Sequence, residues 1–225
     1  MRLVATLLTL AAAPMAMAES MTYTAKVSGA RIGTITMNGE ANSSSYAVSG
    51  QLSGSGVLGA IFDISYNGTA SGSRAGEAFR PAKTDFTSGS RGDVTNTAIR
   101  WNGTTVASAT RGDGEQASNL GAYSGALDPL SATYFLARTQ PKASVCNDRM
   151  KVFDGKRAVD IVIGAPTATA NGVTCNARWT RQEDENLGKV MERSGSFTLT
   201  YTGGDQVSLQ RIDVPSPVGR AVISR

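Results

Sequence analysis

The stretch LDPLSATYFLA, from Leu127 to Ala137, decides which fold the rest of the chain can form. Asp128 is a good N-cap, and Pro129 suits the first helical position, where a missing N–H leaves no bond unmade. Pro141 ends the element a few residues later. The sequence therefore predicts one short helix over Asp128–Arg138.

Apolar residues of this stretch recur at helical spacing. Leu130, Tyr134 and Ala137 fall on one stripe, which predicts an amphipathic helix. A helix of about ten residues is too short to be stable alone in water. We therefore expect the helix to exist only because a second element packs against its apolar stripe.

The rest of the chain is typical of β-strands. Apolar and polar residues alternate with a period of two in residues 22–27, 45–52, 159–163 and 197–201. Such alternation buries one face of a sheet and leaves the other in water, which favours antiparallel pairing. The expected fold is mainly β, a single antiparallel curved sheet or half-open β-barrel, with the short helix packed on its concave face.

Five dipeptides have the residue types of tight hairpin turns, because Asn, Asp and Gly adopt the positive φ angles that such turns need. No repeat period and no long linker separates them, so we expect a single domain over residues 19–225. The dipeptides are Asn38-Gly39, Asn67-Gly68, Asn102-Gly103, Asp154-Gly155 and Asn171-Gly172.

The first 18 residues have the order of a signal peptide. Arg2 supplies the positive charge, residues 3–13 are apolar, and small residues at Ala16 and Ala18 suit the peptidase. We therefore expect cleavage between Ala18 and Glu19, and a soluble protein exported to the periplasm. A buried N-terminal helix is the alternative. No later run has the ~20 apolar residues of a spanning helix, so we expect no membrane-spanning segment.

Two cysteines, Cys146 and Cys175, remain in the predicted mature chain. In an oxidising compartment an even pair is most simply a disulfide, and closing a loop of this length stabilises a fold by about 3–4 kcal/mol. Two free thiols at a metal or redox site are the alternative. The spacing is not C-x-x-C, and no histidine is present to complete a ligand set.

Catalytic motifs are missing from the sequence. Without histidine, Ser-His-Asp and Cys-His catalysis and histidine-based zinc sites are excluded. The Gly54–Gly59 run GSGVLG fits a dinucleotide fingerprint but lacks the long helix that must follow it. The mild positive charge is spread along the chain, which argues against nucleic-acid binding. We expect no enzyme, and no catalytic, cofactor-binding or metal-ligating residues.

Four segments together resemble a known family. They are YTAKVSGARIGTITM, LDPLSATYFLART, KVFDGKRAVDIVI and IDVPSPVGRAVISR, and they are similar to the bacterial domain of unknown function 3108. The resemblance implies an exported, β-rich envelope protein and carries over no active-site residue. A looser likeness in architecture links this pattern to the periplasmic lipoprotein carriers, whose half-open β-barrels hold acyl chains, although a fold does not fix a function.

These observations favour a non-catalytic periplasmic protein that binds an apolar ligand, such as a lipid or acyl chain, or that maintains the envelope. Leu130, Tyr134, Phe135 and Leu136 are the candidate ligand-lining residues. A structural or interaction protein that binds another envelope protein is the first alternative. A carboxylate-based glycan hydrolase, with the acidic residues 183–185 as its densest cluster, is the second.

Overall fold

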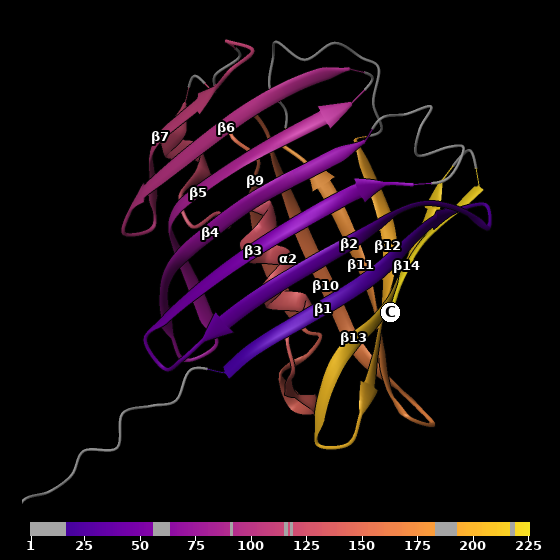
Figure 1. Ribbon diagram of the computed structural model, residues 1–225. Helices are drawn as coiled ribbons and strands as arrows, with labels where there is room; N and C mark the ends of the chain where they lie inside the picture. Colours follow the sequence, from indigo (N-terminus) through magenta and orange to yellow (C-terminus); the bar gives the residue numbers. More distant parts are fainter. Residues whose placement is uncertain are drawn as a thin grey trace, which may run out of the picture.

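The computed structural model of the protein describes residues 17–55, 64–90, 92–114, 117, 119–182, 193–216 and 219–225. Most of these residues are β-strand, and one described α-helix lies inside the curved sheet (Figure 1). The described elements, in chain order, are β1 (Met17–Val27), β2 (Ala30–Ala41), β3 (Ser45–Gly54), β4 (Ser65–Ala75), β5 (Ala78–Ser90), β6 (Asp93–Asn102), β7 (Thr105–Arg111), the 3-10 helix η1 (Leu120–Tyr123), α2 (Pro129–Ala137), β8 (Gln140–Pro141), the 3-10 helix η2 (Lys142–Ser144), β9 (Asp148–Phe153), β10 (Ala158–Thr169), β11 (Gly172–Arg181), β12 (Ser194–Gly203), β13 (Gln206–Ser216) and β14 (Gly219–Ser224).

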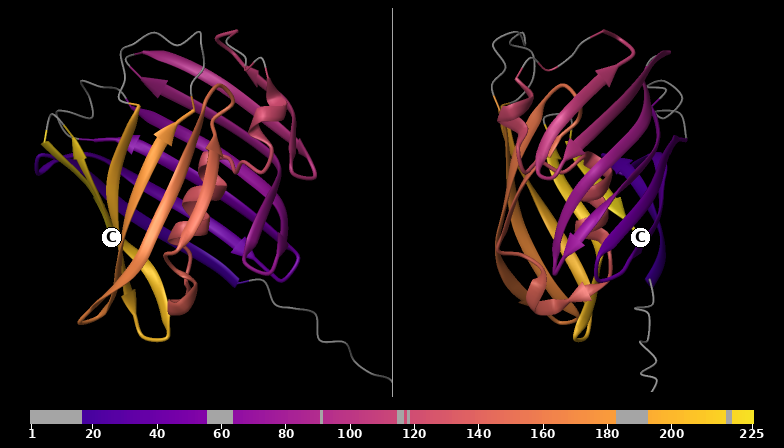
Figure 2. Two further views of the ribbon diagram at one scale, coloured as in Figure 1. Left: turned by 180° about the vertical axis from the view of Figure 1, so that it is seen from behind. Right: turned by 90° about the vertical axis from the view of Figure 1, so that its left-hand side faces the viewer.

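The described strands form one antiparallel sheet built from two meanders. Strands β1 to β7 form the first and β9 to β14 the second, and the pairing of β14 with β1 joins them. The sheet curls so that the two meanders face one another (Figure 2). Strands β7 and β9 are its edges and do not pair, so the sheet stays open between them. The expected antiparallel, half-open arrangement with a helix on the concave side is confirmed.

Helix α2 lies between the two meanders (Figure 2). It packs against β3, β4 and β5 of the first meander and against β9 and β13 of the second. Asp128 caps its N-terminus as expected, because Oδ1 accepts hydrogen bonds from the N–H groups of Leu130 and Ser131. The helix ends at Ala137, before the Pro141 that the sequence suggested as its end.

The helix is less amphipathic than its sequence suggested. The three residues of the expected stripe are buried, but Ser131 and Ala132 on another side are buried as well. Thr133 is the only exposed residue of α2. The prediction of one apolar stripe facing one sheet surface was wrong in this respect, because strands of both meanders pack against the helix.

Two strand glycines let α2 approach the sheet closely. A Cβ atom at Gly39 of β2 would lie 2.3 Å from Cε2 of Tyr134, and one at Gly50 of β3 would lie 2.6 Å from Cδ1 of Leu130. Carbon atoms in contact normally lie about 3.5–4.0 Å apart. Side chains of α2 therefore occupy the space that any larger residue would need, and this part of the concave face is filled core.

The same contacts correct two turn predictions. Asn38-Gly39 and Asn67-Gly68 lie inside β2 and β4, not in hairpin turns. Glycine is needed there because Tyr134 packs over Gly39 and Phe86 packs over Gly68. Turns are confirmed at Asn102-Gly103 and Asp154-Gly155, whose glycines have φ of +61° and +93°, whereas Gly172 already belongs to β11.

The expected disulfide between Cys146 and Cys175 is present. The Cα atoms are 5.7 Å apart, and both residues are buried. The bond joins the segment before β9 to β11, across the intervening strand β10. It therefore helps to hold β9, which is one edge of the sheet, in a fixed position.

The gap between the two edges is partly covered. Leu127 pairs with β9 in parallel: its N–H donates to the Lys151 carbonyl, and its own carbonyl accepts from the Phe153 N–H, both at 2.8 Å. The 3-10 helix η1 packs against β7. Covered edges do not recruit further strands. The first residues of β5, however, extend past β6, whose pairing with β5 begins at Lys83.

Candidate ligand-binding site

A pocket of about 340 Å³ lies between the start of β5 and strand β9, beside α2. Its volume falls at the lower end of the range of small-molecule sites, about 300–1,000 Å³. We call it the seam pocket. Its lining residues are Glu77, Ala78, Phe79, Gly125, Leu127, Phe135, Asp148, Arg149, Met150 and Lys151.

The inner part of the seam pocket is apolar. Three of its lining residues are buried in the core: Phe79 of β5, Met150 of β9, and Leu127, which precedes α2. Phe135 of α2 is half-buried. The rings of Phe79 and Phe135 meet edge to face, with centroids 5.6 Å apart. Edge-to-face aromatic pairs stabilise by about 0.5–1.5 kcal/mol beyond the area that they bury. These four side chains form a preformed apolar surface, which we call the floor of the pocket.

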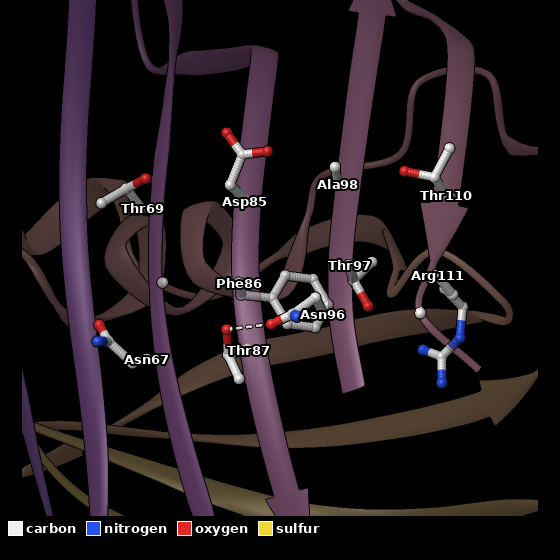
Figure 3. Close-up of a pocket in the computed structure, with 12 residues that line it drawn as sticks. Asn67, Thr69, Asp85, Phe86, Thr87, Asn96, Thr97, Ala98, Thr110 and Arg111 are labelled. Atoms are coloured by element: carbon white, nitrogen blue, oxygen red, sulfur yellow. Dashed lines mark hydrogen bonds between the residues drawn. The ribbon is translucent and has the colours of Figure 1, made fainter. Parts of the chain in front are cut away.

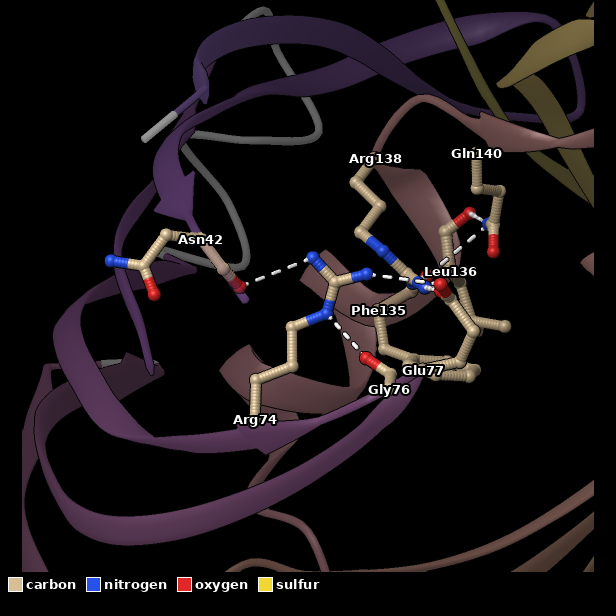
Figure 4. Close-up of polar contacts among 8 residues, drawn as sticks. All are labelled: Asn42, Arg74, Gly76, Glu77, Phe135, Leu136, Arg138 and Gln140. Atoms are coloured by element: carbon tan, nitrogen blue, oxygen red, sulfur yellow. Dashed lines mark hydrogen bonds and ion pairs between the residues drawn. The ribbon is translucent and has the colours of Figure 1, made fainter. Parts of the chain in front are cut away.

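A buried arginine lies behind the floor. The Arg138 guanidinium stacks on the rings of Phe135 and Phe79, with Cζ 4.6 and 5.1 Å from their centroids. It donates to the Phe135 carbonyl and forms an ion pair with Glu77 (Figure 4). Burial lowers the pKa of Arg138 from its usual value, whereas Glu77 acts in the opposite direction. The second oxygen of Glu77 pairs with Arg74 at 3.0 Å, so both carboxylate oxygens are occupied.

Three charged residues of β9 form the rim of the pocket. The Asp148 carboxylate accepts the backbone N–H of Arg149 at 2.7 Å. The Lys151 ammonium donates to the Ala122 carbonyl at 3.0 Å. The guanidinium of Arg149 is exposed and has no ion-pair or hydrogen-bond partner among the described residues. The rim therefore combines one engaged carboxylate with two cations that retain free donors.

Two further hollows lie on the outer face of the first meander. One, of about 560 Å³, crosses β4 to β7 and is lined by short polar side chains (Figure 3). In it the Thr87 hydroxyl donates to Oδ1 of Asn96 at 2.6 Å. The other, of about 600 Å³, crosses β1 to β5 and shares Thr69 with the first. Both lie across strands of the outer face, whereas the seam pocket lies between the two sheet edges and beside α2.

A group of polar atoms is buried where α2 begins. Oδ1 of Asp128 caps the helix, but its Oδ2 and the hydroxyls of Thr84 and Tyr66 have no hydrogen-bond partner of good geometry among the described residues. Burial raises the pKa of Asp128 above its usual value, and the neighbouring Ser131 and Thr84 oppose the shift. Nearby, the hydroxyls of Tyr46 and Ser131 lie 2.8 Å apart. The cluster fixes how α2 sits on the sheet.

The structure separates the four candidate ligand-lining residues. Leu130 and Tyr134 lie in the filled core, 4% and 1% exposed. Phe135 lines the seam pocket. Leu136 is half-buried, packs against the core, and accepts a hydrogen bond at its carbonyl from Gln140. The acidic residues 183–185 lie outside the described residues.

Sequence reasoning did not find the partners of Phe135. Phe79 and Met150 come from strands that are distant in the chain, and Leu127 comes from the connection before the helix. Alternation marks Met150 as inward-facing. The pocket is open because β6 pairs with β5 only from Lys83 onward and leaves the first residues of β5 without a neighbouring strand. No local sequence pattern indicates this register.

The described part of the chain contains no helix long and apolar enough to cross a membrane. Its architecture is β-barrel-like: an open antiparallel sheet curled around one helix. The chain belongs to the family of proteins of unknown function DUF3108, whose family model matches residues 21–224. The family resemblance expected from the sequence is confirmed.

A solved structure is similar to the chain over nearly its whole length. It is the crystal structure of a β-barrel-like protein of domain of unknown function DUF1849 from Brucella abortus, with a TM-score of 0.46 and 7% sequence identity. The similarity covers 94% of this chain and 95% of that chain. Comparison with curated protein sequences finds no match.

Proposed function

We propose that the protein is exported to the periplasm and binds an apolar chain, such as an acyl chain, in the seam pocket without catalysing a reaction. The signal-like order of residues 1–18 supports export, and the family match begins just after it, at residue 21. Glu19, the expected first residue of the mature chain, lies in β1, and its carboxylate accepts the Thr139 N–H at 2.9 Å. The disulfide fits an oxidising compartment.

One observation carries the binding proposal: the apolar floor of the seam pocket. The concave face beside Gly39 and Gly50 is filled by α2, so that region offers no space for a ligand. The seam pocket differs because Phe135 remains half-buried and faces a volume of about 340 Å³. Burying apolar ligand surface there gains about 25 cal/mol per Å².

The surroundings of the pocket favour binding over the two alternatives. Both oxygens of Glu77 are ion-paired, so Glu77 does not offer Asp148 the free carboxyl partner that a glycan hydrolase needs. Leu127 and η1 cover parts of the two sheet edges. That coverage disfavours a protein partner that adds a strand.

Titration with the neutral dye 1-N-phenylnaphthylamine, whose fluorescence rises in apolar surroundings, tests the proposal. We expect saturable binding that lauric acid displaces. Replacing Phe135 by alanine removes the half-buried ring from the floor and should weaken dye binding several-fold. Phe197→Ala is the matched control, because Phe197 is a half-buried phenylalanine of β12, away from the pocket. Equal binding by both variants, or no saturable binding at all, would refute the proposal.

Location is tested separately. Fractionation of cells that express the full chain is expected to place the protein in the periplasm, with Glu19 as its N-terminal residue. An intact N-terminus in the cytoplasm would contradict export and would leave the binding test unaffected.

A further inference from the structure

We infer that the ligand of the seam pocket is a single-chain amphiphile with an anionic head, bound by Arg149 and Lys151. The inference rests on the proposed function, because it assigns the head group of the chain that the floor holds.

Cations outnumber carboxylates in and around the pocket. Glu77 and Asp148 line the pocket, but Glu77 is engaged by two guanidiniums, those of Arg74 and Arg138. Two further cations, Arg149 and Lys151, stand at the rim. The lining thus holds two cations and two carboxylates, and Arg74 and Arg138, which lie outside the lining, neutralise Glu77. The positive charge of the pair on β9 is not balanced by an ion pair among the described residues.

Hydrogen-bonding capacity is distributed in the same way. The acceptors of Glu77 and one oxygen of Asp148 are used. A guanidinium has five N–H donors, and those of Arg149 have no described partner. Lys151 uses one of its three donors on the Ala122 carbonyl. The rim therefore offers donors to a ligand and few acceptors.

Strand β9 supplies both the donors and part of the floor. Arg149 and Lys151 are two positions apart on β9, about 6.6 Å along the strand, and lie on the same side of it. Met150 between them points to the opposite side and is buried in the floor. Because β9 is an edge of the sheet, a carboxylate or phosphate between the two cations would sit at the rim while its alkyl chain passes the strand edge to Met150 and Phe135.

Arg138 does not serve as the head-group residue. Its guanidinium lies over the rings of Phe79 and Phe135 and is paired with Glu77. Its role is to hold these two rings in place behind the ligand. The head group is therefore assigned to β9 alone, which makes the inference specific to two side chains.

Displacement of the neutral dye by amphiphiles of equal chain length tests this inference on the full mature protein. The competitors are lauric acid, lauryl phosphate, dodecanol and dodecylamine, each below its solubility limit or micelle concentration. We expect at least one of the two anions to displace the dye at about tenfold lower concentration than dodecanol. Their order tells a fatty-acid source from a phosphate-headed lipid.

A variant with both Arg149→Ala and Lys151→Ala should lose the preference for anions, so that lauric acid and lauryl phosphate displace the dye at about the concentration that dodecanol needs. Arg178→Ala, which removes an exposed cation of β11, is the matched control and should keep the preference. Dodecanol or dodecylamine displacing the dye as well as the anions, or a preference that survives in the double variant, overturns the head-group assignment alone. Absence of saturable dye binding to the wild type overturns the proposed function and this inference together.

Discussion

Replacing Gly39 by alanine is the sharpest test of how α2 is held in the sheet. The new Cβ would lie 2.3 Å from Cε2 and 2.6 Å from Cζ of Tyr134. The ring would have to move by about 1 Å to restore normal contact, and it is only 1% exposed, so it has little room. Overpacking of this kind costs about 1–3 kcal/mol. The gain from a stiffer unfolded chain offsets about 0.4–1 kcal/mol.

We therefore expect Gly39→Ala to lower the free energy of unfolding by roughly 1–2 kcal/mol. Urea denaturation gives this value, provided that the slope m is unchanged. Gly204→Ala is the control, because a Cβ there has no atom within 4 Å. In a Tyr134→Leu background, which removes the clashing ring atoms, the cost of Gly39→Ala should fall, and a double-mutant cycle measures the coupling. Equal stability of the Gly39 and Gly204 variants, or zero coupling, would refute the close approach of α2 to β2.

Three further predictions concern groups that hold the helix and the pocket. Burial raises the pKa of Asp128, so the free energy of unfolding of the wild type falls as pH rises from about 4, the pKa of the unfolded chain, to the pKa of the folded protein. The Asp128→Asn variant keeps a capping oxygen and should not show this loss in urea titrations at several pH values. An unchanged pH dependence in the variant would contradict this prediction. Replacing both Cys146 and Cys175 by serine should lower the free energy of unfolding by about 3–4 kcal/mol. A reductant should lower the stability of the wild type by a similar amount and leave that of the variant unchanged. A wild type whose stability is insensitive to reductant would count against the bond. Glu77→Gln should cost about 1–3 kcal/mol in thermal or urea unfolding, because the buried Arg138 loses a charged partner; no measurable change would show that the pair has no structural role.

Much of the fold can be predicted from the sequence because it depends on local patterns. Alternation identifies the strands, and the Asp128-Pro129 start identifies the one described helix. Asn38-Gly39 was misassigned as a turn because the same dipeptide suits a turn and a close helix contact. Only the three-dimensional position of Tyr134 decides between them.

The candidate site could be predicted only in part. Phe135 was found because it belongs to the helix, and it does line the pocket. Phe79 and Met150 could not be associated with it, because their meeting depends on the strand register that leaves the start of β5 uncovered. The buried face of α2 was also misjudged, since the helix sequence does not tell whether a sheet covers one side of it or several.

We place the apolar chain in the seam pocket and not inside the filled core. A crystal structure of the mature protein with a fatty acid that carries bromine at the end of its chain distinguishes the two positions. We expect an anomalous bromine peak against Phe135 and Met150, with the carboxylate beside Arg149. A peak between α2 and strands β2 and β3, or on the outer face of the sheet, would contradict it.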